Sequence, residues 1–417
     1  MKTTKLKVIA LATLTILSGF ACKKDKVEPK EPNLIPKHIE LTAKAPQVIK
    51  GGNDFGIELF TRVADGNSEN LMLSPLSASI ALTMVLNGSE NETYEQLLSA
   101  LKYPSDIDIN DINEAYKSLV NQLLNADPKV KIAIANALFY RLGFHIKPPY
   151  LATMSNVFSS DIEGLDFNLP SALSTINQWA NENTFGKIPK VLDEISADAV
   201  MFLMNALYFK GDWSYQFDRL LTDSQPFRLD NGTTINAETM QGEVGARIHF
   251  GTNYRVLEMP YGRTNFTMVV IVPEETLQGF YPQLTGDEWN QITENLDGQT
   301  DFYTVNAFLP KFNFSYEDYL ESHLKSMGMV DAFIPFVADF SGITDDPIYI
   351  SFVKQNTFVE VNEEGTEAAA VTTIGFDLES IGPGQPPVFK VDRPFVFAIR
   401  ERTTNTLMFI GHVTDPR

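Results

Sequence analysis

The chain has 417 residues, a formal net charge of −20 and a hydrophobic share of 44%. This composition is typical of a packed globular protein and excludes disordered, collagen-like and coiled-coil chains. The acidic balance, without a basic stripe, excludes nucleic acid as a partner. A single cysteine excludes a disulfide scaffold and any metal site built on cysteines.

The first 49 residues are expected to lie outside the folded domain. Three early lysines precede a short apolar run that ends at Leu17, and small residues then lead to Cys22. This order predicts a signal peptide over residues 1–21. The residues before Cys22 resemble a bacterial lipobox, which implies a lipid on that cysteine; a plain signal peptide with a stray cysteine is the alternative. Residues 22–49, rich in Lys, Glu and Pro, are then a flexible tether.

The lipobox resemblance also implies a location. A lipid on Cys22 would hold the protein in the bacterial cell envelope, at the outer membrane, on either its periplasmic or its surface face. The membrane is expected to be a partner only through this lipid.

Residues 50–417 are expected to form one domain, because no linker-like segment interrupts them. Ser74 and Pro75 predict a helix start, and Gly88 predicts its end. Further helices are expected over 112–124 and 173–183. Strands are expected over 132–140, 200–209, 266–272, 304–309, 348–352, 358–361, 394–400 and 406–413. This mixture without βαβ regularity predicts an α+β fold with large mixed or antiparallel sheets.

The residues offer no marked catalytic or metal-binding motif. The five histidines are scattered, and the sequence lacks the common zinc, nucleophile-elbow and phosphate-loop patterns. Asp106-x-Asp108-x-Asn110 resembles the start of a calcium loop, but Asp111 replaces the turn glycine and Lys117 the final glutamate. Capping of a helix start is the better interpretation. The sequence therefore predicts neither an enzyme nor a bound metal or cofactor.

The segment that follows Gly365 has an unusual pattern with a period of two. One side of the predicted strand is small and uncharged, and the other carries a single charge: Thr366, Ala368, Ala370 and Thr372 alternate with Glu367, Ala369, Val371 and Thr373. Such a strand can enter a packed core with little steric or desolvation cost. Gly365 gives the backbone freedom to swing. An ordinary surface loop, running on to Pro387, is the alternative.

The stretch Glu363-Glu364-Gly365-Thr366-Glu367-Ala368-Ala369-Ala370 resembles the hinge of the inhibitory serpins. Further serpin-like motifs follow the family's order across residues 53–417: Asn70–Ser77, Asn205–Trp213, Leu309–Phe312, Arg393–Phe397 and Phe409–Pro416. The resemblance implies a serpin fold, with a large central sheet, two smaller sheets, about eight or nine helices and a reactive loop exposed at about 363–390.

The implied function is a suicide-substrate inhibitor of proteases. A protease would cleave the reactive loop, and the freed hinge would then enter the central sheet as an extra strand. The hinge residues are Glu363, Glu364, Gly365, Thr366, Glu367, Ala368, Ala369, Ala370, Val371 and Thr372. Serine proteases are the expected partners, with cysteine proteases left open, and the inhibitor is expected to be a monomer. The alternative is a non-inhibitory binding or carrier lipoprotein of the same fold.

Family spacing from Gly365 places the cleaved bond at Glu379–Ser380. Because the following stretch is longer than usual, Phe376, Asp377, Leu378 and Ile381 are alternatives. No basic residue lies between Gly365 and Pro387, so trypsin-like targets are not expected.

The resemblance also implies residues that control opening of the sheet. Ser74, Ser77 and Asn205 match a polar cluster beneath the sheet, where Gln355 replaces the family's usual histidine. Trp213 matches a tryptophan at the top of the sheet, and Lys311 the partner of Glu363.

Overall fold

The computed structural model describes residues 34–366 and 385–417. Several residues singled out in the sequence lie outside this described part. They are the signal peptide, Cys22 and the first part of the tether, the hinge residues Glu367 to Thr372, and the candidate cleavage residues Phe376, Asp377, Leu378, Glu379, Ser380 and Ile381.

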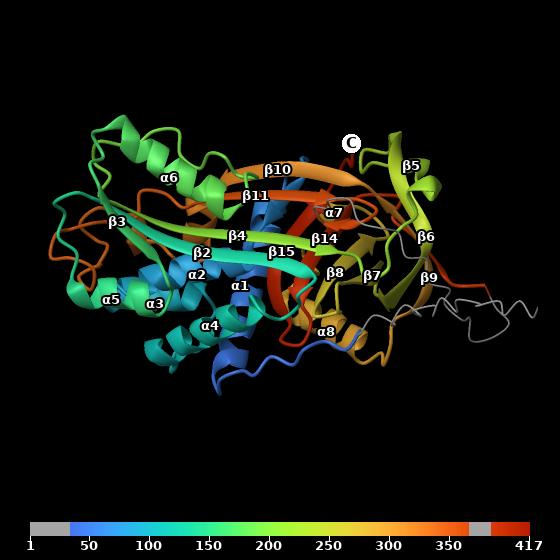
Figure 1. Ribbon diagram of the computed structural model, residues 1–417, viewed down its shortest axis with the longest axis horizontal. Helices are drawn as coiled ribbons and strands as arrows, with labels where there is room; N and C mark the ends of the chain where they lie inside the picture. The colour runs from blue at the N-terminus through green and yellow to red at the C-terminus, as the bar shows by residue number, and fades with distance from the viewer. Residues whose placement is uncertain (1–33, 367–384) are drawn as a thin grey trace, which may run out of the picture. The chain divides into compact units, whose positions relative to one another are not determined.

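The first sheet has six strands in the order β10-β11-β12-β4-β2-β3 (Figure 1). Its strands are β2 (Val130–Arg141), β3 (Asp161–Leu165), β4 (Met201–Asp212), β10 (Phe312–Tyr319), β11 (Lys354–Val361) and β12 (Gly365–Thr366). The two-residue β12 pairs with β11 on one side and β4 on the other. Within the described residues, no backbone pairing joins β11 directly to β4.

The second sheet has nine strands and is organised around the 18-residue β6. Its strands are β1 (Leu71–Leu73), β5 (Asp223–Arg228), β6 (Thr234–Gly251), β7 (Tyr254–Tyr261), β8 (Phe266–Pro273), β9 (Tyr303–Pro310), β13 (Val388–Lys390), β14 (Phe395–Glu401) and β15 (Thr406–Val413). The first part of β6 pairs with β5 and β9, and its last part with β7. The two smaller sheets that we expected are therefore joined through one long strand.

Nine α-helices accompany the sheets in the described part of the chain. They are α1 (Ala45–Ala64), α2 (Pro75–Leu86), α3 (Asn91–Ala100), α4 (Ile109–Leu123), α5 (Pro148–Asn156), α6 (Pro170–Asn183), α7 (Leu277–Phe280), α8 (Gly286–Asp297) and α9 (Glu321–Ser326). Ser74 caps α2, and Asp108 accepts a hydrogen bond from the Asn110 amide at the start of α4. Both capping predictions and the α+β fold class are confirmed.

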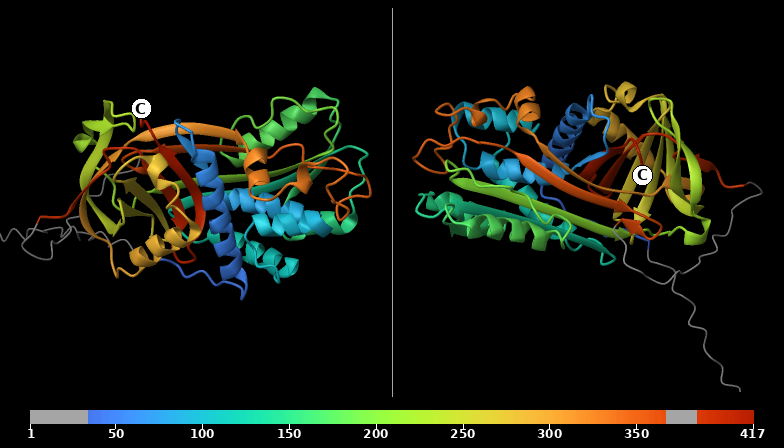
Figure 2. Two further views of the ribbon diagram at one scale, coloured as in Figure 1. Left: turned by 180° about the vertical axis from the view of Figure 1, so that it is seen from behind. Right: turned by 90° about the horizontal axis from the view of Figure 1, so that it is seen from above.

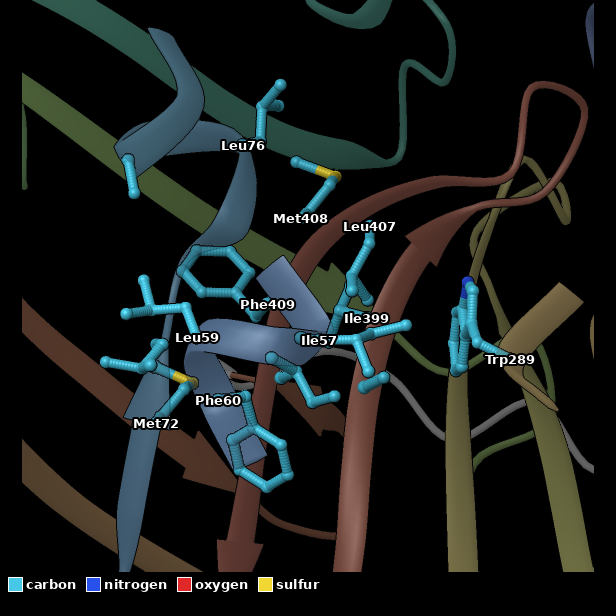
Figure 3. Packing of buried hydrophobic residues seen from close by; sticks show 14 of the residues in the cluster. Ile57, Leu59, Phe60, Met72, Leu76, Trp289, Ile399, Leu407, Met408 and Phe409 are labelled. Carbon is cyan, nitrogen blue, oxygen red and sulfur yellow. The ribbon is translucent and has the colours of Figure 1, made fainter. Parts of the chain in front are cut away.

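The two faces of the six-stranded sheet are covered differently. Phe139 and Phe202 pack with α6 in one apolar cluster, which defines the outer face. Leu138 points the other way, into the main core shared with α2 and the second sheet. In that core, side chains of α1 such as Phe60 lie beside β14 and β15 (Figure 3). Seen from behind, the blue α1 crosses the red C-terminal strands (Figure 2).

The structure corrects the expected start of the domain. Residues 34–49 were assigned to the tether, but they pack on the domain: Ile39 is buried and α1 begins at Ala45. The Asn265 side chain accepts a hydrogen bond from the Lys37 amide at 2.7 Å and donates one to the Lys37 carbonyl at 2.8 Å. The polar composition of residues 34–49 did not predict this docking, because the docking depends on backbone hydrogen bonds and a few apolar contacts. No helix of the described residues is long and apolar enough to cross a membrane.

The strand expected over 348–352 is also wrong. This stretch forms no β-ladder, although its Ile350 amide donates to the Ala332 carbonyl at 2.8 Å. Its apolar residues are half-buried or exposed, and they line a cavity instead of joining the sheet.

Buried His412 on β15 predicts a dependence of stability on pH. Burial lowers its pKa to about 4, despite the hydrogen bond from its ring to the Glu69 carbonyl. Tyr281 approaches the other ring nitrogen. Between pH 6.5 and 4 the unfolded chain therefore binds a proton that the native protein does not, and the free energy of unfolding should fall by about 3 kcal/mol. Urea unfolding across this range measures the fall.

A His412→Gln variant is the matched control for this dependence, because its side chain can keep one donor and one acceptor without titrating. Its free energy of unfolding should change less between pH 6.5 and 4. Equal slopes for the two proteins would show that His412 does not cause the dependence.

Candidate functional site: the hinge and the open sheet

The hinge starts as a tight turn between β11 and β12. The Asn362 and Gly365 backbones exchange hydrogen bonds of 2.9 and 3.2 Å, and the Asn362 side chain accepts the Glu364 amide at 3.0 Å. Gly365 has φ of +156°, and a Cβ there would lie 2.1 Å from the Gly211 carbonyl oxygen. A glycine is therefore required where the chain turns into the sheet.

Thr366 already lies inside the sheet. It is buried, and it pairs with Val361 of β11 and Gly211 of β4. Its hydroxyl lies 2.6 Å from that of Tyr261 on β7. Burial raises the pKa of Tyr261, which therefore stays protonated. Since Tyr261 belongs to the second sheet, the side chain of Thr366 points inward.

The carboxylate of Glu363 is held by two side chains. Lys311 donates at 3.1 Å, as the resemblance implied, and Thr222 donates at 2.8 Å. Burial alone would raise the pKa of Glu363, but hydrogen bonds from the backbone, Thr222 and Lys311 hold it below its ordinary value. Glu363 therefore stays ionised at neutral pH.

Glu364 and Trp213 fix the other side of the turn. The Trp213 amide donates to the Glu364 carbonyl at 2.8 Å, and its indole donates to the Asn362 carbonyl at 2.9 Å. The indole stacks on Tyr261, with 4.4 Å between ring centroids. Arg219 forms an ion pair with one carboxylate oxygen of Glu364, while the other is buried and has no hydrogen-bond partner among the residues described.

A cavity of about 460 Å³ opens among β4, α2 and the stretch before and along β11. Its walls include Leu203 and Leu207 of β4 and Ile350. The four residues predicted to lie beneath the sheet, Ser74, Ser77, Asn205 and Gln355, all line this space. The six-stranded sheet is therefore continuous at the hinge, where β12 joins β11 to β4. It is open along the rest of these two strands, where the cavity lies.

Three of these four residues are joined directly. The Ser77 amide donates to the Ser74 hydroxyl at 3.3 Å. The Gln355 side chain accepts the Ser74 amide at 2.9 Å and donates to the Ser74 carbonyl at 3.0 Å. Asn205 is bonded elsewhere, because it donates to the Asn136 side chain at 2.7 Å. The Asn205 Oδ1 atom is buried, and no group in the described chain donates to it. The cluster implied by the resemblance is therefore split into two parts that face one cavity.

Comparison with known proteins agrees with this geometry. A family model described as Serpin (serine protease inhibitor) matches residues 50–416. Leukocyte elastase inhibitor of Xenopus laevis is 33% identical over 377 residues, which cover 87% of this chain and 97% of that protein. This chain belongs to the serpin family. Members of this family are mainly protease inhibitors and not enzymes.

Solved serpin structures share the fold. The thermophilic serpin tengpin in its native state matches with a TM-score of 0.80 at 33% identity, covering 91% of this chain and 96% of that one. Human thyroxine-binding globulin in complex with thyroxine matches with a TM-score of 0.79 at 25% identity, covering 90% and 100%. The second match shows that the serpin fold also occurs in a protein that binds a small molecule.

Several residues around this serpin's hinge could not be identified from the sequence. Arg219 and Thr222 hold the hinge glutamates, Tyr261 supports Thr366, and Asn136 pairs with Asn205. They come from segments far from the hinge in sequence, and no local pattern marks them. Only the paired strands and the turn after β4 bring them together.

Proposed function

We propose that this serpin inhibits proteases as a suicide substrate. The observation that carries the proposal is the position of Gly365 and Thr366, which form the first two residues of a strand between β11 and β4. The protease nucleophile attacks the carbonyl of the cleaved bond, forms an acyl-enzyme ester and releases a new amino terminus. The freed hinge then continues β12 into the open part of the sheet, carrying the attached enzyme.

The register at β12 supports this insertion. Gly365 faces Asp212 and Thr366 faces Gly211, so a continued antiparallel strand would place Ala368 opposite Phe209 and Ala370 opposite Leu207. Both alanines would then point inward, like Thr366, and their small side chains suit the core. Thr372 would lie opposite Asn205 and could supply the missing donor to its Oδ1 atom.

The test is incubation with a panel of serine and cysteine proteases. A target should form a covalent complex that survives denaturing electrophoresis, and mass spectrometry of the released C-terminal peptide identifies the cleaved bond. Cleavage by every protease without any such complex would contradict inhibition. A peptide that begins at Ser380 would support Glu379–Ser380 as the cleaved bond.

Trypsin should form no stable complex with this serpin. The loop between Gly365 and Pro387 carries no Lys or Arg, so the specificity pocket of trypsin has no side chain to bind. Titration of trypsin activity with excess serpin should leave the activity nearly unchanged. A stable trypsin complex would place the reactive bond outside this loop.

The small side chains of the hinge favour inhibition over the alternative of a carrier. A carrier has no need to insert its loop, so it has no need for uncharged residues at every inward position from Thr366 to Thr372. The serpin that binds thyroxine nevertheless shows that this alternative is realised on the same fold.

We also propose that Cys22 carries a lipid that anchors the serpin in a bacterial outer membrane. The basic start, the short apolar run and the small residues before the only cysteine support this. Mass spectrometry of the mature amino-terminal peptide tests it, since an unmodified Cys22 in the protein from its native membrane would contradict the anchor.

A further inference from the structure

The open part of the six-stranded sheet leaves apolar side chains poorly covered. Leu203 and Leu207 of β4 pack against the main core and line the cavity of about 460 Å³, yet both are only half-buried. On the facing wall, Ile350 is half-buried and Tyr349 is 43% exposed. Apolar surface that stays in contact with water lacks the favourable free energy of burial. Such a lining is typical of a site that a ligand covers.

The cavity is long and about one chain wide. Its wall on β4 runs from Met201 to Leu207, which is about 20 Å at the rise of a β-strand. At the hinge, the single strand β12 fits between β11 and β4, so the space that continues between these two neighbours also has room for one extended chain. An unbranched molecule therefore fits this shape better than a compact one.

Helix α2 forms an apolar wall on the inner side of the sheet. Ala78, Ala81 and Val85 line the cavity from one face of the helix, because they are spaced by three and four residues. Two of the polar residues nearby, Ser74 and Gln355, already hydrogen-bond to each other. The middle of the cavity therefore offers mainly apolar contacts, which suit an aliphatic chain.

The charged residues of the cavity favour a cation. Three of them line it: Glu194, Asp198 and Lys354. Lys354 is paired with Glu317 at 3.0 Å. Glu194 and Asp198 are exposed just before β4, at the end of the cavity away from the hinge, and the carboxylate of neither bonds to any residue that the structure describes. A positively charged group would find its counter-charge there, whereas an anion would be repelled.

We propose that this cavity binds an unbranched aliphatic amine. The chain of the ligand lies between β4 and α2, and its ammonium group lies beside Glu194 and Asp198. Burial of the half-exposed apolar walls drives the binding, and the two carboxylates select the charge of the head group. This binding goes beyond protease inhibition, because it concerns the uncut protein and uses no residue of the reactive loop.

The test is calorimetric titration of the uncut protein with decylamine, 1-decanol and decanoate, which share one chain and differ in the charge of the head group at neutral pH. Decylamine should bind at one site per protein, and decanoate should bind about 3-fold to 10-fold more weakly. Replacing both carboxylates, by Glu194→Gln and Asp198→Asn, should weaken decylamine binding by a similar factor and leave 1-decanol binding unchanged. A general change in the fold would alter both.

Two further variants locate the site. Leu203→Trp fills the apolar wall and should weaken all three probes at least about tenfold; Leu203→Phe serves if urea unfolding shows that the tryptophan prevents folding. The matched control for charge combines Glu95→Gln and Glu114→Gln, on the exposed faces of α3 and α4, and should leave decylamine binding unchanged.

Equal affinity for decylamine and decanoate, binding unaffected by the Leu203 variants, or no binding of any probe would overturn this inference. None of these results bears on the proposed inhibition of proteases, because every titration uses the uncut protein without a protease.

Discussion

Thr366→Arg should convert this serpin from an inhibitor into a substrate. Thr366 is 4% exposed and sits between β11 and β4 with its hydroxyl against Tyr261. An arginine cannot stay at this position without burying an unpaired charge, which costs at least several kcal/mol. It should therefore expel β12 from the sheet, so that insertion has to start without a strand already in place. Each increment of about 1.4 kcal/mol in the insertion barrier slows insertion about tenfold.

The expected result is cleavage of the loop at the normal rate with little or no covalent complex. The stoichiometry of inhibition should rise at least about tenfold, because a slower insertion lets the acyl-enzyme hydrolyse first. Thr366→Ser keeps the hydroxyl beside Tyr261 and should form complex nearly as well as the wild type. Normal complex formation by Thr366→Arg would show that inhibition does not require this position to lie inside the sheet.

Glu258→Gln should cause the largest loss of stability among single changes that preserve volume. Glu258 and Arg400 are fully buried and joined at 2.7 Å. Arg400 also contacts Asp297 at 2.9 Å, and Arg247 lies 3.4 Å from Glu258. Burial alone would raise the pKa of Glu258, but the two arginines hold it below its ordinary value. Removing its charge leaves two buried guanidinium groups short of a counter-ion.

We expect the free energy of unfolding to fall by about 3 kcal/mol or more, which is typical when one partner of a buried pair is lost. Urea unfolding measures it. Asp193→Asn, which breaks the solvent-exposed pair between Lys190 and Asp193, is the matched control and should cost only a small fraction of this loss. Equal losses for the two variants would show that the buried cluster contributes no special stability.

Local sequence patterns predicted much of this fold. Helix starts at Ser74 and Asp108 followed from capping chemistry, and the long strands β2, β4 and β15 followed from apolar runs. The same reasoning failed over 348–352, because residues that line a cavity and residues in a β-ladder give the same apolar pattern. It also failed over 34–49, where docking depends on backbone groups that composition does not record.

The candidate site was predictable only in part. The hinge residues stand in one segment, so their alternation is visible in the sequence. The contact of Lys311 with Glu363 was implied by the serpin resemblance and is present. Arg219 and Thr222 reach the hinge glutamates through strand pairing and the turn after β4. Such relations arise from long-range pairing, which a single sequence does not reveal.

The central claim is that the sheet between β11 and β4 accepts the cleaved hinge as a new strand. The most direct measurement is the urea unfolding midpoint before and after a single cut in the loop between Thr366 and Gln385. Insertion would complete the ladder between two strands that the described residues join only through β12, so the midpoint should rise strongly after the cut. An unchanged or lower midpoint would contradict the account.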